Sequence, residues 1–156
     1  MPESLFQRRL QAYTMAGDVA GAAELTERYL RYNPTSRAAL SAAAQLAIDR
    51  GDSERARSIL SWLRDNGGSR DVQLLSDLAV LQVQAGDIEA AQRTALASYH
   101  LQRSSPVASQ ALAFSYAADG RRRHMAPALL DKAYAMLGNT PLIAQVRRML
   151  AAGGLG

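Results

Sequence analysis

The chain has 156 residues, of which 48% are hydrophobic and 21% are charged, a composition that supports a packed core and excludes wholesale disorder. It has no cysteine, which excludes disulfides, thiolate metal sites and a cysteine nucleophile. The net charge of +4 is uneven, because residues 1–89 hold ten arginines and twelve acids while residues 90–156 hold eight basic residues and two acids.

A first series of helix-stop signals recurs along the chain with spacings of 34, 35 and 34 residues. In each case a glycine suits the position directly after the end of a helix. In the first three cases an aspartate follows it and suits the N-cap of the next helix. The fourth member has arginine in place of aspartate, so we expect a looser turn there. The series is Gly17-Asp18, Gly51-Asp52, Gly86-Asp87 and Gly120-Arg121.

A second series of breaks falls about seventeen residues after each glycine and predicts the loops between helix pairs. These breaks are Asn33-Pro34, Asn66-Gly67-Gly68, Ser104-Ser105-Pro106 and Gly138-Asn139-Thr140-Pro141. Together the two series predict four repeats, each of two helices, at residues 3–35, 36–69, 70–105 and 106–140. Apolar residues at steps of three and four give each helix one buried face. A final amphipathic helix, residues 141–152, is placed to cap the last repeat, with Arg147 and Arg148 facing water.

This pattern resembles the tetratricopeptide repeat, whose period is 34 residues. Pro34, and loosely Pro106, match the proline that ends the repeat, and Tyr13 and Tyr116 match the aromatic residue late in its first helix. Leu10 and Tyr29 depart from the pattern, since small residues are usual there. The small residues expected at helix contacts are Ala22, Ala44, Ala56, Ala79, Ala91, Ala113, Ala126 and Ala133.

The resemblance implies an all-α fold: an α-solenoid of antiparallel helix pairs wound as a right-handed superhelix, forming a single domain over residues 1–156. In the family, the first helix of each pair lines a concave groove that binds peptides or proteins. The resemblance therefore implies a non-enzymatic protein–protein interaction scaffold. Carried over position by position, the groove residues are Gln7, Gln11, Gln45, Asp49, Ser76, Asp77, Val80, Gln84, Gln110 and Phe114.

Family members that clamp the C-terminal carboxylate of chaperones use Lys, Arg and Asn at set groove positions. This chain has other residues at those positions, so we expect no such clamp and a neutral, glutamine-rich groove. The positions hold Gln7, Gln11, Ala42, Ser76 and Asp77.

No motif for catalysis or cofactor binding is present in the sequence. His100 and His124 have no second ligand three or four residues away, so we expect no metal site. No glycine-rich phosphate loop or nucleophile elbow occurs. We expect neither a cofactor, nor a small-molecule substrate, nor enzyme activity.

An alternative function depends on the basic run Arg121-Arg122-Arg123, which could bind nucleic acid or an anionic membrane. No aromatic residues alternate with this run, which disfavours nucleic acid. Trp62 leaves two interpretations open: an exposed interface anchor, or a ring folded against the next repeat.

The first helix has no preceding helix to cover it, so we expect Leu5, Phe6, Leu10 or Tyr13 to be exposed. Such a face predicts either a second copy packed against it or a longer repeat chain. No signal peptide or transmembrane segment appears in these residues, and a cytoplasmic location is the default expectation.

Overall fold

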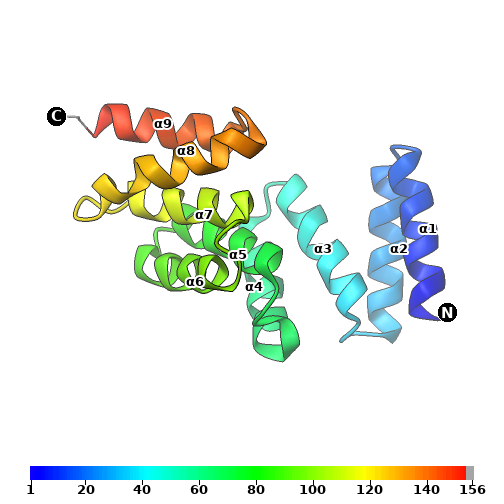
Figure 1. Cartoon of the computed structure of the whole chain (residues 1–156). Coiled ribbons are helices and arrows are strands. Elements are labelled where there is room, and N and C mark those ends of the chain that lie inside the picture. Colours follow the sequence, from blue (N-terminus) through cyan, green and yellow to red (C-terminus); the bar gives the residue numbers. More distant parts are fainter. Residues whose placement is uncertain (154–156) are drawn as a thin grey trace. The chain divides into compact units, whose positions relative to one another are not determined.

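The computed structural model describes residues 1–153, which form nine α-helices and no strand (Figure 1). The predicted all-α fold, with four helix pairs and a terminal helix, is confirmed. The helices are α1 (Glu3–Met15), α2 (Val19–Tyr32), α3 (Arg37–Asp49), α4 (Ser53–Leu63), α5 (Val72–Gln84), α6 (Ile88–Leu101), α7 (Pro106–Ala117), α8 (Ala126–Leu137) and α9 (Pro141–Ala152). A kinked turn (Arg64–Gly68), whose backbone is non-helical at Asn66 and Gly67, follows α4, and a 3-10 turn (Arg123–Met125) precedes α8.

Three of the four predicted glycine turns have the expected backbone. Gly17, Gly51 and Gly86 have φ angles of 71°, 77° and 83°, in the left-handed region that glycine adopts at little cost. Gly120 is not left-handed, and α8 begins only after five further residues, the last three of which form the 3-10 turn. The looser fourth turn is therefore confirmed.

The predicted aspartate caps are partly present. The Asp18 carboxylate accepts a hydrogen bond from the Gly21 amide at 2.8 Å, and Asp52 accepts one from the Arg55 amide at 3.3 Å. Asp87 makes no side-chain cap, so that prediction was wrong. Its helix begins without this bond because the first-turn amides can instead be solvated.

Residue contacts group the chain into two compact units, which we describe separately. Unit 1 is Met1–Leu63, and unit 2 comprises the described residues from Arg64 onward. In unit 1, α1 contacts α2 and α3, and α3 contacts α2 and α4. The stacked rings of Phe6 and Tyr29, with centroids 4.5 Å apart, occupy a core completed by Leu25 and Ala39.

The burial of Phe6 corrects one expectation, since its side chain is 0% exposed rather than on an open face. The physical reason is Tyr29, which stands where a small residue is usual and offers Phe6 a ring to stack on. Leu5 and Leu10 are half-buried, and Tyr13 is 37% exposed. Self-association through this face, or its covering by further repeats, stays a prediction.

Unit 2 is built around α7, which contacts α5, α6, α8 and α9. Every residue of α7 from Ala108 to Ala117 is buried except Gln110. The eight alanines expected at helix contacts across both units are all buried, which confirms that small side chains let these helices approach closely.

The terminal helix α9 begins at Pro141, as predicted, because the Thr140 hydroxyl accepts a hydrogen bond from the Ile143 amide at 3.0 Å. Ile143 is buried in the core of unit 2, while Arg147 and Arg148 are exposed. None of the helices in residues 1–153 combines the length and the hydropathy that crossing a membrane requires.

Candidate functional site

Unit 1 has a hollow of about 250 Å³ on the surface formed by α1, the α1–α2 turn, the first turn of α2 and α3. Two of the predicted groove residues, Gln45 and Asp49, line this hollow from α3. Gln7 and Gln11 are exposed on α1 and lie outside its lining. The full lining is Leu10, Thr14, Gly17, Asp18, Val19, Ala22, Ala42, Gln45, Leu46 and Asp49.

The polar groups of this hollow are oriented by local hydrogen bonds. Gln45 Nε2 donates to Asp49 Oδ1 at 2.9 Å, and the Thr14 hydroxyl donates to the Leu10 carbonyl at 2.9 Å. Asp18 caps α2 through the Gly21 amide. Among the described residues, no arginine or lysine forms an ion pair with Asp18 or Asp49. The hollow therefore combines an apolar floor with two carboxylates that lack a cation.

In unit 2, three predicted groove residues lie on accessible parts of α5. Asp77 and Val80 are half-buried, and Gln84 is exposed. Gln73 Nε2 donates to Asp77 Oδ1 at 2.9 Å, the same four-residue pairing as between Gln45 and Asp49. Burial raises the pKa of Asp77; the Gln73 bond opposes this effect, and the charge of Asp71 adds to it.

The other predicted groove residues of unit 2 are buried or form hydrogen bonds within this unit. Ser76 is 1% exposed, and its hydroxyl shares a 2.8 Å hydrogen bond with that of Ser98, which in turn donates to the Val72 carbonyl. Phe114 is 2% exposed in the core. Gln110 is half-buried and its Oε1 accepts a hydrogen bond from the Thr140 hydroxyl, which caps the terminal helix.

The structure thus places Ser76 and Phe114 inside unit 2 rather than on its surface. The physical reason is what these two side chains contact: the Ser76 hydroxyl pairs with Ser98 of α6, and Phe114 lies within the core cluster of unit 2.

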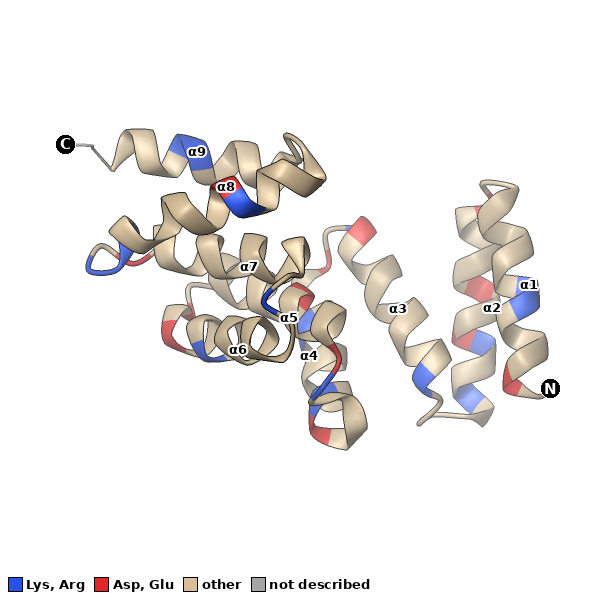
Figure 2. Cartoon of the chain, in the orientation of Figure 1, with Lys and Arg blue, Asp and Glu red and all other residues tan. Residues whose placement is uncertain are grey.

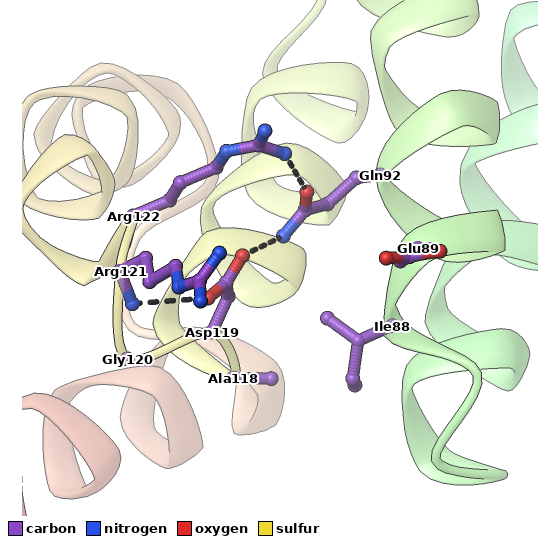
Figure 3. A pocket seen from close by; sticks show the side chains of 8 residues that line it. All are labelled: Ile88, Glu89, Gln92, Ala118, Asp119, Gly120, Arg121 and Arg122. Atoms are coloured by element: carbon purple, nitrogen blue, oxygen red, sulfur yellow. Dashed lines mark hydrogen bonds between the residues drawn. The ribbon is translucent and has the colours of Figure 1, made fainter.

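A second hollow, of about 490 Å³, lies between α6 and the loose turn before α8 (Figure 3). The side-chain amide of Gln92 stands between Asp119 and Arg122: it donates to Asp119 Oδ2 at 2.9 Å and accepts from Arg122. The Arg121 amide donates to Asp119 Oδ1 at 3.0 Å. The Gln92 bond, then the Arg121 amide, lower the pKa of Asp119, against a smaller effect of desolvation.

This network fastens the long turn of the fourth repeat to α6, and the sequence reasoning missed it. A signal was available, because Asp119 directly precedes Gly120, so the acidic residue of this turn has moved from one side of the glycine to the other. Gln92 is only 3% exposed, which identifies it as a part of the fold.

The basic run is also partly used within unit 2. The Arg123 guanidinium donates to the Ala117 carbonyl at 3.0 Å and to the Gly153 carbonyl at 3.4 Å, and Arg122 is held by Gln92. Arg121 is exposed. His100 and His124 are at the surface, and residues 1–153 contain no group of three or more side chains able to hold a metal ion. Trp62, on α4, is 40% exposed.

Comparison with known proteins identifies the repeat. Residues 13–73 match the family model described as tetratricopeptide repeat. A search of the curated proteins gives no match.

Several solved structures share the fold. A thermophilic tetratricopeptide-repeat protein of Thermus thermophilus, TTC0263, superimposes with a TM-score of 0.71 at 22% identity, over 98% of this chain and 84% of that one. MamA of AMB-1 gives 0.68 at 22% identity, over 88% and 74%. A repeat protein of Parabacteroides merdae gives 0.69 at 15% identity, over 96% and 59%. Residues 13–73 thus carry the sequence pattern of a tetratricopeptide repeat, and these neighbours show that the chain has the α-solenoid fold of helix pairs.

Proposed function

We propose that the chain is a non-enzymatic scaffold that binds a peptide or protein segment on the surface formed by the first helices of its pairs. Tetratricopeptide-repeat folds generally mediate protein–protein interaction, and the finer assignment to this surface is our proposal. The observation that carries it is the hollow of unit 1, which joins an apolar floor to oriented polar groups from α1 and α3. The proposal treats residues 1–156 as one repeat domain.

The chemistry of this surface suits an extended segment. A peptide backbone presents donors and acceptors in alternation, and the exposed side-chain amides of Gln7 and Gln11 in unit 1 can both donate and accept. Leu10, Val19 and Leu46 line the hollow of unit 1 and can receive the apolar part of a side chain. Directional bonds would then fix the backbone while the hollow selects the side chain.

The test is a selection of binding peptides from a random display library on the full chain, followed by affinity measurements on two matched variants. Val19 is 58% exposed and lines the hollow, whereas Tyr32 is 81% exposed on the same helix and does not. Both tolerate glutamine as a helix-compatible, uncharged replacement. We expect Val19→Gln to weaken the affinity for the selected peptides roughly three- to tenfold, because one apolar contact is lost. Tyr32→Gln should leave the affinity unchanged.

A different result would sink the proposal. If Val19→Gln had no effect while Arg121→Ala abolished binding, the binding site would lie at the exposed Arg121 and not on the surface of the first helices. Backbone amide shifts measured by nuclear magnetic resonance on the same complexes would locate the bound segment independently.

A further inference from the structure

We propose that the partner segment is basic, and that an arginine or lysine side chain of the partner enters the hollow of unit 1. Asp77 of unit 2, considered by itself, suits a cationic residue in the same way. This inference rests on the proposed function and names the chemistry of its partner. A basic partner requires an acidic binding surface, whereas the sequence predicts a neutral groove.

The first argument is the shape and charge of the unit 1 hollow. Its floor is aliphatic, with Leu10, Val19 and Leu46, and two carboxylates, Asp18 and Asp49, line the same space. Arginine and lysine side chains have this same division, since an apolar stem carries a charged end. An aliphatic side chain would leave both carboxylates without a partner, and an anion would be repelled by them.

The second argument is that these carboxylates have unused capacity. Asp49 accepts from Gln45 through Oδ1, and Asp18 accepts from the Gly21 amide through Oδ1, so the second oxygen of each remains available to a partner's donor. The other exposed acids of this unit include Glu24, Glu27 and Glu54, which are each paired with an arginine of the same unit. The acids that line the hollow are thus distinguished from these three acids elsewhere on unit 1.

The third argument comes independently from unit 2. Asp77 repeats the arrangement of Asp49: a carboxylate on the first helix of a pair, held by a glutamine four residues earlier. It is half-buried, no arginine or lysine pairs with it among residues 64–153, and the charged group that acts on it is another acid, Asp71. A buried charge that lacks an opposite charge is costly, and a partner's cation would relieve that cost.

The fourth argument is the distribution of charge over the first helices (Figure 2). The chain is basic overall, with a net charge of +4, yet α5 carries only Asp77 and α7 carries no charge. On α3 the two charges lie at opposite ends, so Arg37 is about 18 Å along the helix from Asp49, beyond the screening length of about 8 Å at physiological salt. Arg8 and Arg9 of α1 lie outside the lining of the hollow.

The experiment uses the peptides selected on the full chain and compares each with a version in which every arginine and lysine is replaced by glutamine. The chain variants are Asp18→Asn, Asp49→Asn and Asp77→Asn, which remove charge and keep the hydrogen-bonding shape; asparagine also caps a helix as well as aspartate does. Controls are Glu24→Gln and Asp131→Asn, which remove exposed acids from α2 and α8, outside the first helices.

We expect the selected peptides to be rich in arginine and lysine. Removing the charges of both Asp18 and Asp49 should weaken the affinity for these peptides about three- to tenfold. Asp77→Asn should weaken it about two- to fivefold, while the control variants should leave it unchanged. If peptides bind, respond to Val19→Gln, and are indifferent to all three asparagine variants, the basic partner is excluded and the scaffold function stands. If no peptide responds to Val19→Gln, the proposed function itself fails, and this inference with it.

Discussion

The fold shifts the pKa values of two aspartates of unit 2 in opposite directions. Asp77 loses hydration on α5 with only Gln73 to compensate it, so its pKa is raised. Asp119 receives a hydrogen bond from the buried Gln92 and another from the Arg121 amide, so its pKa is lowered. The side-chain type is the same, and the difference arises because burial has the largest effect on the pKa of Asp77, whereas hydrogen bonds have the largest effect on that of Asp119.

Replacing Asp77 by asparagine is expected to raise the melting temperature at neutral pH. A folded pKa above the unfolded value means that the ionised carboxylate destabilises the fold at neutral pH, and that this cost disappears as pH falls through the folded pKa and then the unfolded value. The gain from Asp77→Asn should therefore be present at neutral pH and absent in acid, below both pKa values. Thermal unfolding followed by circular dichroism under both conditions measures it.

Asp119→Asn provides the control of opposite sign. Because the folded pKa of Asp119 is lowered, its stabilising effect is present above the unfolded pKa and is lost as pH falls through the folded pKa. Asp119→Asn should lower the melting temperature at neutral pH and converge with the wild type in acid. Equal responses of the two variants at neutral pH would contradict both assignments.

At the scale of the elements, the turns between paired helices differ in what they require of glycine. Gly51 has a left-handed backbone and open space around it, so an added Cβ would meet no neighbour and would still strain the backbone. Gly120 also has open space, and its backbone is one that other residues adopt. The two positions therefore separate backbone strain from steric contact.

We expect Gly51→Ala to cost about 1–2 kcal/mol in the free energy of unfolding, and Gly120→Ala to be neutral or to stabilise by up to about 1 kcal/mol. Urea denaturation of the two variants gives both numbers. A cost at Gly120 equal to that at Gly51 would show that the fourth turn has the same backbone as the other three.

The helices and their order could be predicted from the sequence because caps and breaks act locally. Thr140 and Pro141 start α9 through groups within three residues, and the prediction placed its bounds correctly. The cap at Asp87 failed because a side chain with the right chemistry need not adopt the bonding rotamer. The Gln92 network was missed because it joins residues 27 to 30 positions apart, beyond the reach of a periodic pattern.

At the scale of the molecule, each unit has a core of its own. The stacked pair of Phe6 and Tyr29 belongs to unit 1, while unit 2 packs around the residues of α7, including Leu112 and Phe114. In repeat proteins, stability is approximately a sum of repeat and neighbour contributions, so damage to one core need not spread through the chain.

Phe6→Ala should cost unit 1 about 3–5 kcal/mol, since it removes a fully buried ring from a stacked pair. Amide hydrogen exchange should accelerate throughout residues 1–63 and stay slow around Leu112. Met15→Ala, on the same helix at a position 81% exposed, is the matched control and should change little. Equal acceleration in both units would show that the two cores unfold together.

The site was less predictable than the fold. Family register assigned Gln45 and Asp49 to the groove; both line the hollow of unit 1, and their role in binding stays a prediction. Ser76 and Phe114 were assigned to the surface by the same register, yet both are buried by neighbours that are distant in the sequence. The absence of a cation beside Asp18, Asp49 and Asp77 in their own units is a property of three-dimensional neighbours, and no local pattern reveals it.

Trp62 gives this chain a built-in optical probe. It is the single tryptophan of the sequence, and it lies on α4 of unit 1 with 40% of its surface exposed. The six tyrosines can be excluded by excitation at the red edge of the absorption band, so the remaining fluorescence reports on the surroundings of Trp62. Changes in emission wavelength and in quenching by iodide would report local unfolding around α4, without any label, in the thermal and urea unfolding experiments.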